Sequence, residues 1–195
     1  ESLGPSSRRT PLVISEIMYN PIARAGGSNL EYVELFNSQP VAEPIGGFRL
    51  SGSIDYTFPP NTRIEGGGFV VVAKEPSALK AASGLPTVYG PYENNLPGDG
   101  GRVTLHSELG AVLIDVEYSD QPPWPASADG AGHSLVLARP SLGEGRSAAW
   151  SASLMRGGSP GAMEPIRLDA WASIKINEFL AHTDDPALDF IELYN

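Results

Sequence analysis

The sequence lacks cysteine altogether, which excludes a disulfide framework and any thiolate metal site. It also lacks an uninterrupted apolar run of roughly 18 residues or more, so nothing in it predicts a membrane-spanning helix. The first residues show neither a basic start nor an apolar stretch, and they do not form a signal peptide. The histidines are few and far apart: His106, His133 and His182 are not at metal-ligand spacing, so we expect surface or capping roles for them.

Positive charge is scarce. Lysine and arginine number 13 against 23 acidic residues, and the formal net charge is −10. A protein that binds phosphate backbones gains affinity by releasing counterions to its basic side chains, and this chain has no such surplus. The composition therefore disfavours nucleic acid as a partner, while the negative charge favours solubility.

Glycine and proline are abundant, with 22 and 18 residues, which is typical of short strands joined by turns. Runs rich in β-branched and aromatic residues recur between turn signals and predict strands. The only predicted helix covers residues 76–82, where proline suits the first turn and Gly84 the end. The expected strands span residues 12–19, 31–37, 47–51, 54–58, 69–74, 102–106, 111–118 and 134–138.

This pattern predicts an all-β sandwich with one short connector helix, because several strands are almost continuously apolar, as in strands that pack on a second sheet. The predicted organisation is a loop-like leader at residues 1–11, a sandwich at 12–162, a linker at 163–173 and the start of a second module at 174–195. Residues 139–165 are expected to be mostly irregular.

The second module is predicted from an internal repeat. The sequence at Ile14–Met18 is echoed at Ile176–Leu180, which lies 162 positions later. The sequence at Glu31–Asn37 is echoed at Asp189–Asn195, 158 positions later, so the intervening loop is four residues shorter. Because the second copy breaks off within a strand-like run and an isolated hairpin is marginally stable, we expect it to dock on the first module, fray or self-associate.

The ordered motifs resemble the lamin-tail domain family. Ile14–Pro21, Glu31–Asn37, Gly47–Leu50 and Gly98–Leu105 match in type and order, and Pro123-Trp124-Pro125 with Gly158–Gly161 resembles the bacterial branch. The resemblance implies an immunoglobulin-like sandwich that binds or scaffolds rather than catalyses. It also implies an accessory module of a larger exported protein, and so an extracellular or cell-surface location.

Three functional hypotheses follow. The first is a non-catalytic module that mediates protein or surface-polymer interactions, and a free strand edge would favour it. The second is an accessory module that binds polysaccharide or nucleic acid for a neighbouring hydrolase, and a concave aromatic strip with Trp124 and Tyr92 would favour it. The third is a small hydrolase that uses Glu16 and Glu34, and a closed, well-packed setting for both would exclude it.

Glu16 and Glu34 are the notable carboxylates, since each stands among apolar strand residues and recurs as Glu178 or Glu192. The strand period places Glu16 on one face with Ile14 and Met18. A buried carboxylate needs a partner, and three interpretations are open: an ion pair with Arg49, Arg102 or Lys74 or backbone hydrogen bonds, a Ca²⁺ site, or an acid–base pair. No other cofactor is predicted.

Trp124, between two prolines, is interpreted either as an anchor for a ligand or as a lid over one end of the sandwich. Two catalytic patterns fail on chemical grounds. Ser159 matches the sequence pattern of a nucleophile elbow but cannot act as one, because Pro160 has no N–H to donate to an oxyanion. Ser77 and Lys80 lack the partner motifs of the serine–lysine enzymes, and no catalytic residue is predicted.

Overall fold

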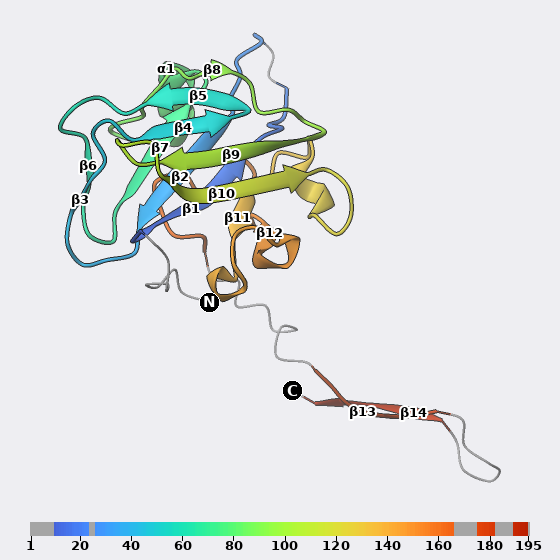
Figure 1. Ribbon diagram of the computed structural model, residues 1–195. Coiled ribbons are helices and arrows are strands. Elements are labelled where there is room, and N and C mark those ends of the chain that lie inside the picture. Colours follow the sequence, from blue (N-terminus) through green and yellow to red (C-terminus); the bar gives the residue numbers. More distant parts are fainter. Residues whose placement is uncertain (1–9, 24–25, 166–174, 182–188, 195) are drawn as a thin grey trace. The chain divides into compact units, whose positions relative to one another are not determined.

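The computed structural model describes residues 10–23, 26–165, 175–181 and 189–194. The chain divides into two compact units, Glu1–Glu164 and Pro165–Asn195 (Figure 1). The first contains two five-stranded antiparallel sheets and one α-helix, so the predicted all-β sandwich is confirmed. Of the predicted leader at 1–11, residues 1–9 lie outside the described residues, as do residues 166–174 of the predicted linker and second module.

One sheet has the order β12-β11-β1-β2-β7. Its strands are β1 (Leu12–Met18), β2 (Tyr32–Asn37), β7 (Phe69–Ala73), β11 (Leu135–Leu137) and β12 (Trp150–Ala152). Every residue of β1 and β2 is buried, as expected for central strands that are covered on both faces.

The other sheet has the order β10-β9-β4-β5-β8 (Figure 1). Its strands are β4 (Arg49–Gly52), β5 (Ile54–Thr57), β8 (Glu93–Asn94), β9 (Gly100–His106) and β10 (Val112–Ser119). The predicted hairpin of β9 and β10 is confirmed. A small ladder joins β3 (Glu43–Pro44) to β6 (Arg63–Ile64).

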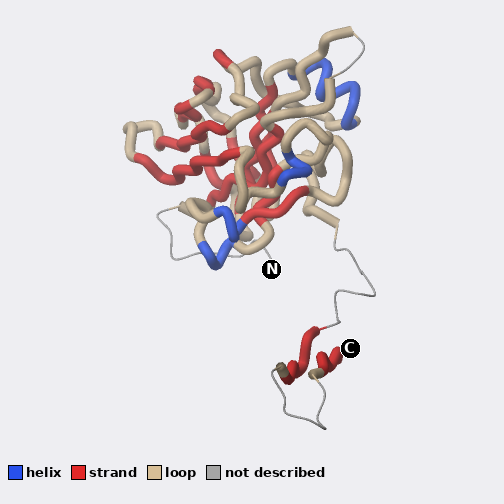
Figure 2. Tube along the Cα trace, turned by 90° about the vertical axis from the view of Figure 1, so that its right-hand side faces the viewer, coloured by secondary structure: helices blue, strands red, loops and turns tan. Residues whose placement is uncertain are grey.

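The main core lies between the two sheets and contains Ile14, Ile17, Leu35, Leu50 and Val103, all fully buried. A smaller cluster packs helix α1 (Pro76–Ser83) on the outer face of the first sheet. Figure 2 shows the strands gathered in the middle of this unit and the helical turns at its margins. Helix α1 confirms the predicted connector helix and ends at Gly84, whose φ of 74° permits the left-handed cap.

The region 139–165 is mostly irregular, as predicted. Its only regular elements are the 3-10 turns η2 (Pro140–Leu142) and η3 (Ser147–Ala149) and the strand β12, and a third such turn, η1 (Ala126–Ala128), precedes β11. Strand β12 was not predicted, because a three-residue strand carries too little alternation to be recognised locally.

The second unit contains a two-stranded antiparallel sheet of β13 (Lys175–Leu180) and β14 (Phe190–Tyr194). Both strands fall on the predicted repeat. Whether this unit is the start of a second module of the same family stays a prediction.

Candidate functional site

Glu16 and Glu34 lie directly opposite each other on β1 and β2, and each is only 1% exposed. The register shifts between Ile14 and Glu16, which marks a β-bulge at Ser15. Ile14 pairs with Leu35, the neighbour of Glu34, so Ile14 and Glu16 face opposite sides of the sheet. The prediction that they share a face was wrong, because the bulge inserts one residue into the two-residue period.

The two carboxylates accept hydrogen bonds from hydroxyl and backbone N–H groups. Ser159 N–H donates to Oε1 of Glu16 at 3.0 Å, and Ser134 Oγ donates to the same oxygen. Gly161 N–H donates to Oε2 of Glu34 at 2.6 Å. The bulge residue Ser15 donates through Oγ to Oε1 of Glu34, also at 2.6 Å. Glu16 and Glu34 therefore hold residues 157–161, hereafter the glycine segment, on the outer face of the sheet.

The glycine segment fits closely because Gly158 has no side chain. A Cβ at this position would overlap the phenol oxygen of Tyr32 and Oε1 of Glu16, and the φ of Gly158 is +77°. A third carboxylate, that of Glu164, also binds the segment, because it accepts a hydrogen bond from the Ser159 hydroxyl at 2.8 Å. Only glycine combines this backbone conformation with this close approach.

Burial shifts the acid–base behaviour of the pair. Desolvation and, second to it, the charge of the adjacent Glu16 raise the pKa of Glu34 from 4.5 to about 8. Desolvation likewise raises the pKa of Glu16. The pKa of Tyr32 is well above its ordinary value because its phenol is buried beside both carboxyl groups. Near neutral pH, Glu34 therefore retains its proton.

The cations considered as partners of the pair are engaged elsewhere. Arg49 forms an ion pair with Asp55, and Arg102 forms one with Asp115. Lys74 donates through Nζ to backbone carbonyls, including that of Asn94 at 2.6 Å. The ion-pair interpretation fails because these side chains lie on the second sheet or face it.

Metal and hydrolytic interpretations receive no geometric support. Within the described ranges, no three histidine, aspartate or glutamate side chains form a group that could hold a metal ion. The glycine segment covers the carboxylates of Glu16 and Glu34, so a substrate has no access to them while it is docked. Ser159 contacts Glu16 and Glu164 as a hydrogen-bond donor, which is a structural role.

Trp124 and Tyr92 are not brought together into a binding strip. Tyr92 is 3% exposed and donates its hydroxyl hydrogen to Oε2 of Glu31 at 3.1 Å. Trp124 is partly buried and packs on Trp150, with ring centroids 6.4 Å apart. Their burial matches the lid interpretation for Trp124 and a core position for Tyr92.

Glu31 is a buried carboxylate whose role the sequence did not reveal. It is 7% exposed and also accepts the N–H of Leu96 at 2.8 Å, which ties β2 to the long loop before β9. Asn29 donates to its other oxygen at 2.8 Å. The only available signal was its position at the start of an apolar strand, as with Glu16 and Glu34.

Strand β10 forms an edge of the second sheet. Its only strand neighbour within the described residues is β9. Arg102 of β9 directs its N–H and C=O toward Ser53, on the β4 side. Its partner Glu117 is therefore a non-hydrogen-bonded position of the β9–β10 ladder, and the backbone groups of Asp115, Glu117 and Ser119 point outward. Every second residue of β10 from Asp115 to Ser119 thus offers an unpaired backbone N–H and C=O to a further strand.

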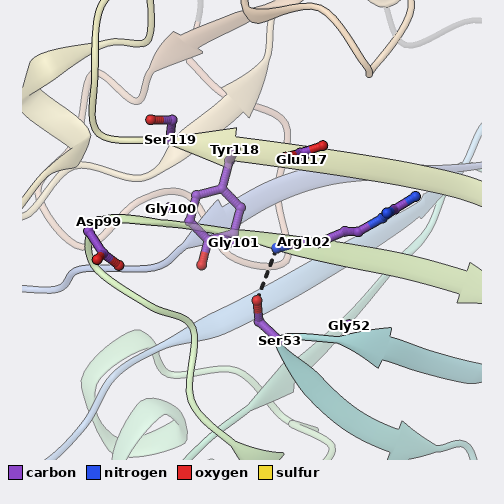
Figure 3. Close-up of a pocket in the computed structure, with 9 residues that line it drawn as sticks. All are labelled: Gly52, Ser53, Asp99, Gly100, Gly101, Arg102, Glu117, Tyr118 and Ser119. Atoms are coloured by element: carbon purple, nitrogen blue, oxygen red, sulfur yellow. Dashed lines mark hydrogen bonds between the residues drawn. The ribbon is translucent and has the colours of Figure 1, made fainter.

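An open polar pocket of about 530 Å³ lies at the end of this edge (Figure 3). Asp99 and Glu117 contribute carboxylates to its lining, and three of the lining residues are glycines. Arg102 donates its backbone N–H to Ser53 Oγ across the pocket at 2.9 Å, while its side chain is held by Asp115. The pocket is lined by Gly52, Ser53, Asp99, Gly100, Gly101, Arg102, Glu117, Tyr118 and Ser119.

Within the described residues, two packed antiparallel sheets and one α-helix define an immunoglobulin-like sandwich. The family model of the lamin tail domain matches residues 5–120. The chain therefore belongs to the lamin-tail domain family, a family of non-catalytic immunoglobulin-like domains with binding and scaffolding roles. No curated protein matches the chain. No helix within the described part has the length and apolarity that a membrane crossing requires.

Proposed function

We propose that the chain is a non-catalytic module that captures an extended segment of a partner protein by strand addition to β10. The observation that carries the proposal is the outward direction of the backbone groups of Asp115, Glu117 and Ser119. An added antiparallel strand would satisfy these groups, and side-chain contacts beside the strand would supply specificity.

The pocket at the end of β10 supports a preference in the ligand. Asp99 and Glu117 contribute carboxylates there, and the one arginine that lines the pocket pairs its guanidinium with Asp115. Asp99, Asp115 and Glu117 outnumber the single guanidinium of Arg102, which also feels the charge of Glu117, so this end of β10 attracts a basic side chain. The proposed ligand is therefore an extended peptide with a lysine or arginine near the position that reaches the pocket.

We further propose that the module belongs to a larger exported bacterial protein and acts outside the cell or at its surface. The support is the resemblance of Pro123-Trp124-Pro125 and Gly158–Gly161 to the bacterial branch of the family. Polysaccharide binding for a neighbouring hydrolase is less well supported, because Tyr92 is buried and Trp124 packs on Trp150.

The test uses the full chain and a display library of random peptides. Enriched sequences are synthesised with a fluorescent label, and their affinity is measured by anisotropy. The proposal predicts enrichment of peptides with alternating β-branched residues and a basic residue. Co-sedimentation with cellulose, chitin and peptidoglycan runs in parallel, and binding to one of these without any peptide binding would overturn the proposal.

A proline variant locates the binding surface. Glu117→Pro removes an N–H that points away from β9, so it deletes a donor to the ligand without removing a bond of the β9–β10 ladder. Glu117→Gln is the matched control, since it removes the side-chain charge and keeps the N–H. We expect Glu117→Pro to abolish peptide binding and Glu117→Gln to weaken only peptides with a basic residue. Equal binding by wild type and Glu117→Pro would exclude β10 as the site.

A further inference from the structure

The glycine segment covers hydroxyl and carboxyl groups of the first sheet. The Tyr32 hydroxyl donates to the Gly157 carbonyl at 3.3 Å, and the Ser134 hydroxyl donates to Glu16. Tyr32, Glu16 and Ser134 also supply the atoms nearest to a Cβ added at Gly158. Lifting the segment would therefore expose groups that water solvates well, so its release costs less than the exposure of an apolar surface.

Hydrogen bonds to Glu16 and Glu34 hold the middle of the segment. Gly157 N–H donates to the carbonyl of Gly132 at 2.7 Å, where the segment begins, and Gly158 N–H bonds within its own turn. Beyond these two residues, the described N–H groups of the segment bind the sandwich through the two carboxylates. A segment with so few backbone bonds to its surroundings belongs to the less stable parts of a fold.

The strands beneath the segment are fixed more firmly. Strand β1 pairs with β11 on one side and with β2 on the other, and β2 also pairs with β7. Every residue of β1 and β2 is buried. A change in the charge of the two glutamates is therefore relieved by movement of the segment and not by movement of the sheet.

The titratable groups around the two glutamates do not neutralise them. Tyr32 of β2 is buried beside both carboxyl groups, and Glu164, which follows the segment, raises the pKa of each glutamate. His133, before β11, has its Nδ1 2.8 Å from a backbone carbonyl oxygen. Lys80 of α1 and Arg156, before the segment, are exposed. No salt bridge of the described residues includes either glutamate.

We propose that Glu16 and Glu34 form a proton-controlled latch for the glycine segment. The segment is docked while the two carboxyl groups hold a proton between them, and it is released when both are ionised. The segment lies shortly before Glu164, the last residue of the first unit. Its release therefore adds residues to the connection between the two units as pH rises.

Two opposing effects decide the direction of the latch. The N–H and O–H donors favour ionised carboxyl groups, whereas burial favours protonated ones. Burial outweighs the donors, because the pKa of Glu34 is about 8 and that of Glu16 is raised as well. After release, water solvates both groups, and they ionise near their ordinary pKa of 4.5. Loss of the proton therefore favours release, by up to about tenfold in the equilibrium constant per pH unit between these two values.

Amide hydrogen exchange of the full chain, resolved by NMR at several pH values from about 5 to 8, tests the proposal. The measured quantity is the protection factor, which is the exchange rate of an unstructured peptide divided by the observed rate. Protection at Ser159 and Gly161 should fall with pH, by up to about tenfold per unit. It should remain constant at Ser107, whose N–H bonds to Ala111 in the β9–β10 turn.

The core amide of Leu105 in β9 separates release of the segment from global unfolding. The latch predicts lower protection at Ser159 and Gly161 than at Leu105 throughout the pH range. Equal protection at all three amides would mean that the segment opens only when the whole unit unfolds, and this would overturn the proposal. Constant protection of the wild-type segment across the range would overturn it as well.

The double variant Glu16→Gln/Glu34→Gln removes both ionisable groups and keeps an acceptor oxygen on each side chain. Its protection at Ser159 and Gly161 should not change with pH. Glu108→Gln is the matched control, since it removes a charge from an exposed turn and should retain the fall in protection. A fall that persists in the double variant, or one that Glu108→Gln abolishes, would show that other groups control the segment.

Discussion

Glu16 faces Glu34 across the β1–β2 ladder, and the two carboxyl groups are buried beneath the glycine segment without a cation between them. Hydroxyl and backbone N–H donors satisfy both groups. Since like charges this close and this deeply buried disfavour double ionisation, the pair retains a proton at neutral pH. It connects the C-terminal end of the sandwich to its two central strands.

The stability of the first unit should fall as pH rises from about 4.5 to about 8. The pKa of Glu34 is about 8 in the folded protein, against an ordinary value of 4.5 for an exposed glutamate, so the folded state binds more protons in this interval. One such group reduces the free energy of unfolding by at most about 1.4 kcal/mol per pH unit. Above pH 8 the contribution is lost and the curve becomes flat.

Urea unfolding at a series of pH values measures this slope. Glu34→Gln removes the titrating group, so its unfolding free energy should vary less with pH and exceed that of the wild type above pH 8. A wild-type stability that rises through the same interval would contradict the assignment of the proton to this pair.

Gly158→Ala should destabilise the first unit by about 3 kcal/mol, because its Cβ overlaps Tyr32 and Glu16 and its φ is positive. Gly84→Ala is the matched control. Its φ is +74°, in the left-handed region, and no atom lies within 4 Å of the added Cβ, so only the backbone cost of about 1–2 kcal/mol remains. Equal losses of stability for the two variants in thermal unfolding experiments would show that the glycine segment is not closely packed against the carboxylate pair.

Two buried tyrosines should respond oppositely to loss of their hydroxyl groups. The Tyr19 hydroxyl has no hydrogen-bond partner among the described residues, so Tyr19→Phe should leave stability unchanged or slightly higher. The Tyr92 hydroxyl donates to Glu31, so Tyr92→Phe should cost about 1–3 kcal/mol. Denaturant midpoints compare the two variants, and a larger loss for Tyr19→Phe would reject the described hydrogen bonding.

Calcium should not alter the melting temperature of the first unit. The oxygens of Glu16 and Glu34 are occupied by N–H and O–H donors, and a Ca²⁺ ion requires six or more oxygen ligands. Thermal unfolding with excess calcium and with chelator checks this. A calcium-dependent rise that disappears in Glu34→Gln would restore the metal interpretation.

The sequence predicts the strands well where proline or glycine marks one end of an apolar run. Pro59-Pro60 follows β5, and Gly66–Gly68 precedes β7. It does not predict β12, because three residues show no period. It also misassigns the face of Ile14, since a bulge such as that at Ser15 has no local signal. Strand order arises from long-range pairing, so the free edge of β10 could not be located from the sequence.

The candidate site was predictable only in part. The repeat of Glu16 and Glu34 as Glu178 and Glu192 identified the carboxylates, because charged residues within apolar strands are conspicuous. Their partners were not identified, since the donors are backbone N–H groups of Ser159 and Gly161, more than 120 positions away. Almost any residue type can supply a backbone N–H, so the sequence carries no signal that identifies such a donor.

Amide hydrogen exchange along β10, resolved by NMR, tests the central claim most directly. The account predicts fast exchange at Asp115, Glu117 and Ser119 in the free protein and slow exchange at Val116 and Tyr118, whose N–H groups face β9. Addition of a peptide selected on the full chain should slow exchange at the first three residues. Slow exchange there in the free protein, or protection by the peptide only at other strands, would contradict strand addition at β10.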